Sequence, residues 1–302
     1  MSPSNDEDAA LPLTSADDVR ARFDEHDYLA DQGLSTSVFL ALRLGIPLLL
    51  EGEPGVGKTA AARVLASCLG VPLVRLQCYE GLSAAEALYD WNYQRQLLAI
   101  RLAESHGERL TEADLFSEEY LIERPVLRCV RYDGPNPPLL LVDEIDRADD
   151  AFEALLLEVL GEGSVTVPEI GTFTAVHPPI VVLTSNRSRD LHDALRRRCL
   201  YHWLEYPEPE RVCAILRRTV PAANEDLISS AAQFVGRVRA LEVDKPPGMA
   251  EAINWVAALS ALGATELMRE TVVATLGAVV KTVDDRETVL AGLDAVLHDS
   301  AS

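Results

Sequence analysis

An eight-residue stretch from Gly52 to Thr59 carries the clearest chemical signal in the chain. It reads Gly-Glu-Pro-Gly-Val-Gly-Lys-Thr, and a glycine, four residues and then Gly-Lys-Thr is the spacing of a phosphate-binding loop. Its glycines can adopt backbone angles that are closed to other residues, so that successive N–H groups turn into one cradle. We expect Lys58 to contact the outer phosphates of a nucleotide and the Thr59 hydroxyl to bind Mg²⁺.

The segments on either side of this loop have the composition that such a loop requires. Ile46 to Leu50 is a short apolar run of the buried-strand type, and Ala60 to Ala66 is a good helix former. A helix that begins at Lys58 would direct the positive end of its dipole at a phosphate. With both flanks in place, a phosphate site is favoured over a glycine-rich turn that binds nothing.

Two further apolar runs end in polar residues that suit hydrolysis. Leu139 to Val142 precedes Asp143 and Glu144, and Ile180 to Ser185 precedes Asn186. Buried parallel strands open onto a ligand site at their carboxyl ends. We expect Asp143 to hold Mg²⁺ through water, and Glu144 to orient and deprotonate the attacking water. Asn186 is placed to hydrogen-bond that water or the γ-phosphate, although an asparagine in a strand-end turn would be the ordinary interpretation in isolation.

A short predicted helix from Leu191 ends in three consecutive arginines, Arg196, Arg197 and Arg198. One hypothesis is a solvated basic helix end, which the helix dipole favours. The other is an arginine finger, a cation inserted into the phosphate site of a neighbouring subunit. The residues alone leave both open, and the surrounding motifs favour the finger.

Before Pro207, strands alternate with helical stretches, which predicts a parallel sheet flanked by helices. A helical insertion is expected at about 84–121 and a β-hairpin at about 164–176. Helices are expected at 35–44 and at 149–160, the latter ended by Gly161. The strands expected after the first one are 71–76, 126–130, 139–144, 180–186 and 199–204.

After Pro207 no convincing strand remains, and the apolar spacing predicts helices that must pack on one another. Asn224 is a candidate N-cap for one of them. The predicted organisation is a flexible acidic tail over 1–22, an α/β nucleotide-binding domain over 23–206 and a helical domain over 207–302. The predicted helices of the last domain are 209–219, 224–240, 249–262, 266–281 and 285–297.

Composition limits the partners and the compartment. The 302 residues carry a net charge of −21, from 27 basic and 48 acidic side chains, which argues against a nucleic-acid-binding surface. The 5 cysteines form no C-x-x-C pair, so no zinc knuckle or redox dithiol is predicted. The acidic N-terminus lacks the apolar region of a signal peptide, and no apolar run approaches membrane-spanning length. We expect a cytoplasmic protein without stable membrane insertion.

The order of these motifs resembles that of an AAA+ ATPase over residues from about 24 to 298. Four stretches narrow the resemblance to the MoxR family: Gly52 to Thr59, Leu141 to Ala148, the hairpin before Thr184 to Asn186, and Ala194 to Arg198. Three others are similar to the branch that includes the carbon monoxide dehydrogenase accessory ATPase CoxD: Tyr79 to Leu82, Leu88 to Tyr93, and Arg198 to Trp203.

This resemblance implies ATP hydrolysis with Mg²⁺ in a homo-oligomeric ring, a hexamer, in which a neighbour's arginine completes each site. It implies Arg198, with Arg197 second, as the finger, and Asn186 as sensor 1. It also implies a chaperone-like role on a client metalloenzyme, with a partner that carries a von Willebrand factor A domain. The insertion and the hairpin would face the pore or the client. The residues expected to bind ATP are Tyr28, Ala30, Gly52, Glu53, Pro54, Gly55, Val56, Gly57, Lys58, Thr59 and Ala60.

One stretch departs from the pattern of the resembled family. The helix that normally begins with a sensor 2 arginine reads Pro246-Pro247-Gly248-Met249-Ala250-Glu251-Ala252, without an arginine. Either Lys245 substitutes for it, or the coupling of this helical lid to the γ-phosphate is weaker in this chain.

Two other functions share the phosphate loop. A nucleic-acid-remodelling AAA+ ATPase would need a basic surface, which the acidic balance disfavours. A monomeric phosphate-loop kinase would transfer phosphate rather than hydrolyse ATP. The adjacent Asp143 and Glu144, the polar Asn186 and the several C-terminal helices favour hydrolysis.

Overall fold

The computed structural model of the chain describes residues 13–297, and these form two compact units. The first unit comprises 30–51 and 59–203, together with the residues up to Arg22. The second comprises 23–29, 52–58 and the chain from Leu204 onward. The phosphate-loop residues 52–58 therefore belong to the same unit as the C-terminal helices, although Thr59 and the strand before the loop belong to the first.

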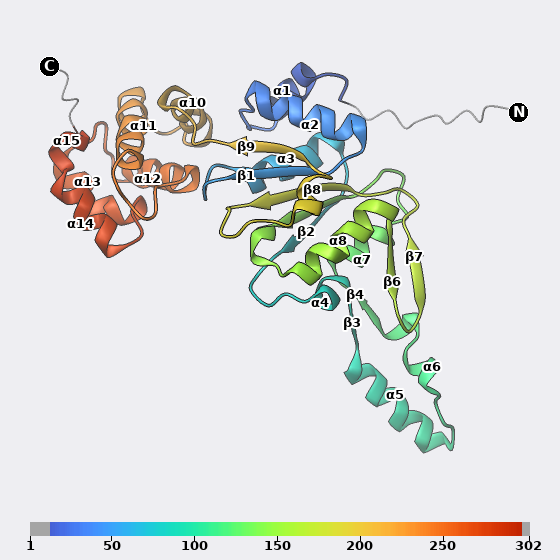
Figure 1. Cartoon of the computed structure of the whole chain (residues 1–302). Helices are drawn as coiled ribbons and strands as arrows, with labels where there is room; N and C mark the ends of the chain where they lie inside the picture. The colour runs from blue at the N-terminus through green and yellow to red at the C-terminus, as the bar shows by residue number, and fades with distance from the viewer. Residues whose placement is uncertain (1–12, 298–302) are drawn as a thin grey trace, which may run out of the picture. The chain divides into compact units, whose positions relative to one another are not determined.

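A five-stranded sheet of order β2-β5-β8-β1-β9 lies at the centre of the first unit (Figure 1). The pairs β2–β5, β5–β8 and β8–β1 are parallel, with Leu140 opposite Val74 and Val181, and Leu49 opposite Leu183. Every residue of β1 and β5 is buried, as expected of strands covered on both faces. The strands are β1 Leu48–Gly52, β2 Leu73–Gln77, β5 Leu139–Asp143, β8 Ile180–Ser185 and β9 Leu200–Leu204.

Helices cover both faces of this sheet. Helices α2 (Gln32–Leu44) and α3 (Lys58–Leu69) lie on one side, and α7 (Pro125–Val130) and α8 (Asp150–Glu162) on the other (Figure 1). A hydrophobic core lies between the sheet and the helices of the second side. In it, fully buried Phe152 and Leu156 of α8 cluster with Leu140 and Val142 of β5. The structure confirms the predicted α/β fold with a parallel sheet flanked by helices.

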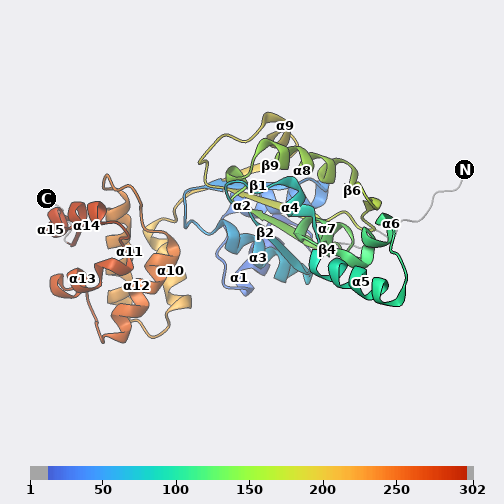
Figure 2. The ribbon, with the colours of Figure 1, turned by 90° about the horizontal axis from the view of Figure 1, so that it is seen from below.

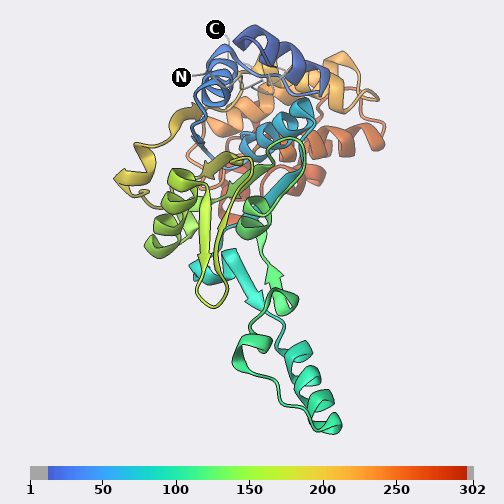
Figure 3. The same cartoon turned by 90° about the vertical axis from the view of Figure 1, so that its right-hand side faces the viewer.

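The predicted insertion forms an arm that projects from the sheet (Figure 3). At its base β3 pairs antiparallel with β4, and the longest helix of the arm, α5, follows β3. A second two-stranded ribbon, β6 with β7, corresponds to the predicted hairpin. The elements of the insertion are α4 Ala84–Leu88, β3 Tyr89–Trp91, α5 Tyr93–His106, α6 Glu112–Leu115, η1 Glu118–Tyr120 and β4 Leu121–Glu123. The ribbon consists of β6 Ser164–Val167 and β7 Gly171–Thr174, and the remaining short elements of the first unit are η2 Ile145–Arg147 and α9 Asp193–Arg196.

The predicted strand at 126–130 is wrong, because this stretch forms helix α7. Pro125 occupies the first turn, where its missing N–H costs nothing and its fixed φ angle suits a helix. Four residues of this helix are fully buried: Val126, Leu127, Cys129 and Val130. The apolar run therefore reflects a helix surrounded by core residues, and not a strand covered on its two faces. A short apolar run does not distinguish these two cases.

The predicted flexible tail at 1–22 is wrong from Ala16, because α1 covers Ala16–Glu25. Val19 and Phe23, four residues apart, are both fully buried on it. Spacing of that kind places two side chains on one helix face, which anchors an otherwise polar helix. The part of the predicted tail at 1–12 lies outside the described residues.

The C-terminal part of the second unit is built from helices, in agreement with the sequence prediction (Figure 2). Asn224 caps α11, accepting a hydrogen bond from the Leu227 N–H at 2.8 Å. Its core centres on Trp255 and Phe234, whose ring centroids lie 4.8 Å apart. The helices are α10 Pro209–Thr219, α11 Glu225–Arg239, α12 Met249–Ala261, α13 Arg269–Thr275, η3 Leu276–Ala278, α14 Val283–Ala291 and α15 Leu293–Leu297.

Two predicted helices of this unit are divided. The stretch predicted at 266–281 becomes α13 and η3, and the one predicted at 285–297 becomes α14 and α15, which Gly292 separates. Within residues 13–297, no helix is long and apolar enough to cross a membrane.

Candidate functional site

The phosphate loop joins β1 to α3 and has the backbone that its glycines were expected to allow. The φ angles of Gly52, Gly55 and Gly57 are 157°, 80° and 106°. These values lie where side chains other than hydrogen are strained, so the three positions depend on glycine. The spacing of the three glycines in the sequence therefore predicts the backbone conformation of the loop.

Lys58 folds back over its own loop. Its Nζ donates to the carbonyl oxygens of Gly52 at 2.6 Å and Glu53 at 2.9 Å, and the residue is only 6% exposed. A phosphate oxygen is a stronger acceptor for an ammonium group than a neutral carbonyl, because the hydrogen bond is then charged on both sides. The Lys58 ammonium group is thus held at the loop, and a bound phosphate can replace the two carbonyl groups as its hydrogen-bond acceptor.

Tyr28 is in the segment between α1 and α2, next to this loop. A Cβ atom added at Gly57 would lie 3.6 Å from the Tyr28 ring, and that ring packs edge-on against Phe23. The neighbouring Leu29 carbonyl accepts a hydrogen bond from Arg211 of α10. Ala30 is half-buried just before α2, and Ala60 is exposed in the first turn of α3. Tyr28 is therefore the member of the predicted adenine pocket that lies against the loop.

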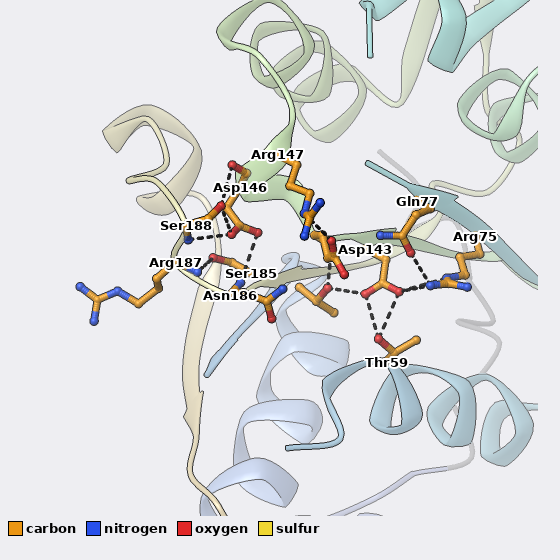
Figure 4. Close-up of polar contacts among 12 residues, drawn as sticks. Thr59, Arg75, Gln77, Asp143, Asp146, Arg147, Ser185, Asn186, Arg187 and Ser188 are labelled. Carbon is orange, nitrogen blue, oxygen red and sulfur yellow. Dashed lines mark hydrogen bonds and ion pairs between the residues drawn. The ribbon is translucent and has the colours of Figure 1, made fainter. Parts of the chain in front are cut away.

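Asp143 ends strand β5 and gathers donors from three elements (Figure 4). Thr59 of α3 donates its hydroxyl to both carboxylate oxygens, at 2.9 and 3.1 Å. Thr184 of β8 donates at 2.5 Å, and Arg75 of β2 approaches through Nη2 at 2.5 Å and Nε at 3.0 Å. The two residues predicted to hold Mg²⁺, Thr59 and Asp143, are thus brought into direct contact.

These two residues offer the ligands that Mg²⁺ prefers. A carboxylate and a hydroxyl supply oxygen atoms, and Mg²⁺ in nucleotide sites is completed by phosphate oxygens and water. In the described part of the chain, no group of three or more His, Cys, Asp or Glu side chains could hold a metal ion. The Asp143 carboxylate and the Thr59 hydroxyl supply part of the oxygen ligands of such an ion, and the residues present fit an ion that a phosphate also binds.

Glu144, the predicted base, has an unusual backbone and a tethered side chain. Its φ and ψ angles are 57° and 50°, the left-handed region that non-glycine residues seldom occupy. Its N–H donates to the Thr184 hydroxyl at 3.0 Å, and its carboxylate pairs with Arg147 at 2.6 Å. Backbone strain of this kind costs about 1–3 kcal/mol and gathers at functional sites. The contacts to Thr184 and Arg147 hold the strained residue in place.

The turn after β8, which carries Asn186, is fixed by a buried carboxylate that sequence reasoning did not single out (Figure 4). Asp146 is 2% exposed and accepts hydrogen bonds from the Asn186 N–H at 3.2 Å and the Ser188 N–H at 2.8 Å. The Ser188 hydroxyl adds a third at 2.6 Å. Asn186 is consequently held at the same sheet edge as Asp143, with its backbone rather than its amide group engaged.

The three arginines at the end of α9 have different surroundings. Arg196 pairs at 3.1 Å with Glu51, a carboxylate of β1 that is 1% exposed. Arg198 is exposed, and its Nη1 donates to the Leu157 carbonyl of α8 at 3.0 Å. Arg197 is exposed, and its guanidinium makes no hydrogen bond or ion pair with residues 13–297. Arg196 therefore has a structural partner inside its own subunit.

Sequence reasoning missed Arg75, Thr184, Asp146 and Glu51. Thr184 had a usable signal, because it directly precedes Ser185 and Asn186 at the end of an apolar strand. Arg75 lies inside a strand, and the pairing of β2 with β5 is needed to bring it to Asp143. Glu51 also lies inside a strand, and its partner Arg196 comes from helix α9, far away in the sequence.

Comparisons with known proteins agree with this geometry. The family model described as AAA domain, dynein-related subfamily, matches residues 47–199. A Lon protease of Halothermothrix orenii is 32% identical over 149 residues, which cover 45% of this chain and 16% of that protein. The uncharacterized protein YeaC of Bacillus subtilis is 29% identical over 185 residues, covering 60% of this chain and 45% of that protein. The chain therefore spans well under two thirds of the curated relatives it matches.

Solved structures repeat the fold. The Thermotoga maritima RuvB Holliday junction branch migration motor superimposes with a TM-score of 0.50 and 18% identity, covering 95% of this chain and 79% of that one. At this identity the likeness concerns the fold alone.

Proposed function

The chain belongs to the dynein-related subfamily of AAA domains, and from this premise we propose that it is a Mg²⁺-dependent ATPase. The observation that carries the proposal is the contact of the Thr59 hydroxyl with the Asp143 carboxylate, at 2.9 and 3.1 Å. It joins the end of the phosphate loop to the acidic strand end, which are the two parts that grip a nucleotide's phosphates and its metal ion.

Each residue then has a defined part in hydrolysis. Lys58 and the loop N–H groups bind the phosphates. Thr59 and Asp143 would hold Mg²⁺, which would supply positive charge to the phosphate oxygens. Glu144 accepts the proton of the water that attacks the γ-phosphorus, and the bond to the ADP oxygen breaks. Asn186 orients this water.

We further propose that the active form is a closed homo-oligomeric ring, a hexamer, in which Arg198 of one subunit completes the site of the next. Arg198 suits this part because it is exposed and carries no carboxylate partner among the described residues, whereas Arg196 is engaged by Glu51. Arg197 is the second candidate.

The finer role that we propose is that of a MoxR-type, chaperone-like motor in the cytoplasm. It would remodel or mature a protein client, a metalloenzyme, together with a partner that carries a von Willebrand factor A domain. The support is the similarity of the stretches Leu141 to Ala148, Leu88 to Tyr93 and Arg198 to Trp203 to that family.

Two substitutions test the ATPase. Lys58→Ala should weaken ATP binding about 100-fold, because a charge-assisted contact to phosphate is lost. Glu144→Gln should keep ATP binding and slow turnover by about 10²–10⁴, because the proton acceptor is removed. Calorimetric titration with ATP and phosphate release measure the two effects. An unmodified protein that neither binds nor hydrolyses ATP would end the proposal.

The alternative function is a nucleic-acid motor. The observation that favours it is the similarity to RuvB, which is described as a Holliday junction branch migration motor. The net charge of −21 speaks against extended phosphate contacts. Stimulation of phosphate release by duplex DNA would favour the alternative. The third candidate, a monomeric kinase, would stay a monomer when sedimented with ATP, whereas a ring motor assembles.

A further inference from the structure

The outer side of the phosphate loop is held by the helical part of its own unit. The Tyr206 hydroxyl donates to the Pro54 carbonyl at 3.0 Å. The Met249 N–H, at the start of α12, donates to the Gly55 carbonyl at 2.9 Å. Two consecutive carbonyl groups of the loop are thus fixed by residues that lie about 150 and 200 positions further along the chain.

These contacts determine where the loop's donors point. A peptide unit is planar and trans, so its C=O and the N–H of the next residue point in opposite directions. With the Pro54 and Gly55 carbonyls directed at Tyr206 and Met249, the N–H groups of Gly55 and Val56 must point away from them. Backbone N–H groups are the donors with which such a loop cradles phosphate.

Arg239 of α11 holds both ends of this arrangement. Its guanidinium stacks on the Tyr206 ring, 4.3 Å from the centroid, and its Nε donates to the Pro247 carbonyl at 2.8 Å. Burial raises the pKa of Tyr206, so its hydroxyl keeps its proton and can donate. One cation therefore positions the tyrosine and the chain segment that leads to Gly248 and Met249.

Gly248 makes the close approach possible. Its φ angle is −78°, which any residue can adopt. A Cβ atom there would nevertheless lie 2.7 Å from the Gly55 Cα and 3.1 Å from the Gly55 oxygen. The lack of a side chain at Gly248 thus serves the contact with the loop and not the local backbone.

We propose that Tyr206, Arg239 and Gly248, with the Met249 N–H, form a lid–loop clamp that orients the phosphate loop for nucleotide binding. The clamp couples the helical unit to the phosphates through loop carbonyls, so this coupling needs no arginine at the start of α12. Lys245 itself is exposed, and its backbone N–H donates to Asp285 of α14 at 3.2 Å. Tyr206, Arg239 and Gly248 are positioning residues, and the inference rests on the proposed ATPase function.

The test compares two glycine substitutions in the full chain. Gly248→Ala should raise the dissociation constant for ADP about tenfold, which is 1.4 kcal/mol, because the loop must shift away from the new Cβ. Gly277→Ala is the matched control, because a Cβ at Gly277 meets nothing within 4 Å. Calorimetric titration with MgADP and with MgATP measures the affinities.

Tyr206→Phe provides a second, milder variant. It keeps the ring that Arg239 stacks on and removes only the hydroxyl, so the affinity for ADP should fall about two- to tenfold. The melting temperature without nucleotide should stay within a degree or two of the unmodified protein, while the rise produced by a fixed ADP concentration shrinks. A residue with a merely structural role would lower the first value instead.

The outcomes separate the two proposals. If the unmodified protein binds no nucleotide, the ATPase proposal fails. If it binds ADP and both Gly248→Ala and Tyr206→Phe bind it equally well, the ATPase stands and the lid–loop clamp is overturned. The clamp is equally overturned if Gly277→Ala weakens binding as much as Gly248→Ala does.

Discussion

Among the buried carboxylates of the first unit, three lie at or near the candidate site, and each has its own partners. Asp143, Asp146 and Glu51 are 3%, 2% and 1% exposed. A charge removed from water is tolerated only where hydrogen bonds or an opposite charge replace the water. Asp143 receives hydroxyls and Arg75, Asp146 receives N–H groups and Ser188, and Glu51 receives Arg196. Of these three carboxylates, Asp143 is the one that contacts the loop's threonine, and we propose it as the one that holds the metal ion.

The Glu51–Arg196 pair yields a prediction about stability. Arg196→Ala would leave the Glu51 carboxylate buried without its nearest cation, since Arg187 lies further away at 4.0 Å. We expect the free energy of unfolding to fall by about 1–3 kcal/mol. Urea unfolding followed by circular dichroism measures it. Arg197→Ala, one position along and exposed, should change it by less than about 0.5 kcal/mol. Equal effects of the two substitutions would contradict the assignment.

Cys78 yields a prediction about reactivity. Burial, followed by the nearby Asp143 charge, raises the pKa of its thiol to about 12. Because pH 8 lies far below that value, only about one molecule in 10⁴ carries a thiolate at Cys78. Iodoacetamide should therefore label Cys78 about 1,000-fold more slowly in the native protein than in guanidinium chloride. Peptide mass spectrometry gives the two rates, and comparable labelling would show that the thiol is not buried as described.

At the scale of elements, the end of α8 shows how a helix stop is chosen between two glycines. Gly161 was expected to end the helix, yet α8 continues to Glu162 and ends at Gly163, whose φ angle is 60°. Apolar packing of Val159 and Leu160 carries the helix past Gly161. Only Gly163 adopts the left-handed conformation that a helix C-cap commonly needs.

Opposite signs are therefore expected at these two glycines. Gly161→Ala should stabilise the protein by about 0.5–1 kcal/mol, because alanine is the better helix former and its Cβ would lie 3.7 Å from the Arg198 Nη1. Gly163→Ala should destabilise it by about 1–2 kcal/mol, since an alanine is strained at positive φ. Thermal unfolding of both variants gives the signs. If both substitutions stabilised or both destabilised, the helix would not end where the structure places it.

The elements that the sequence predicted well are those whose neighbours it also specified. The strands β1, β5 and β8 are short apolar runs, each followed by polar or loop residues with a chemical signature, and the phosphate loop needs glycine at three fixed positions. Helix α7 was mistaken for a strand because its apolar run carries no period, and α1 was missed because only Val19 and Phe23 anchor it. Boundaries moved most where a capping side chain decides them, as Asp31 does by starting α2 at Gln32 rather than Ser35.

The candidate site divides along the same line. Thr59, Asp143, Glu144 and Asn186 could be named as candidates because each stands at a loop or strand end with a chemical signature. Arg75, Asp146 and the lid–loop clamp could not be identified, because their partners come from strands and helices far away in the sequence. Such contacts depend on strand order and on helix packing, which a single sequence does not specify.

At the scale of the whole molecule, the proposed ring makes each active site a property of two subunits. Arg198→Ala should leave ADP binding unchanged and lower ATP turnover about 10³-fold, because the loop is intact and the neighbour's cation is missing. Lys58→Ala should lose turnover for the opposite reason, since its loop fails while its Arg198 remains. Each variant alone is then inactive through a different half of the site.

Mixing the two inactive variants tests this division. An interface works when an Arg198→Ala subunit, which has an intact loop, receives Arg198 from a Lys58→Ala neighbour. In a randomly mixed 1:1 ring about one interface in four has that arrangement, so turnover should recover to about a quarter of the unmodified rate per site. Each variant mixed with itself is the control. A mixture that stays inactive while both variants enter the same assembly would show that Arg198 acts on its own subunit. If Arg197→Ala restored turnover in such a mixture and Arg198→Ala did not, the finger would be Arg197.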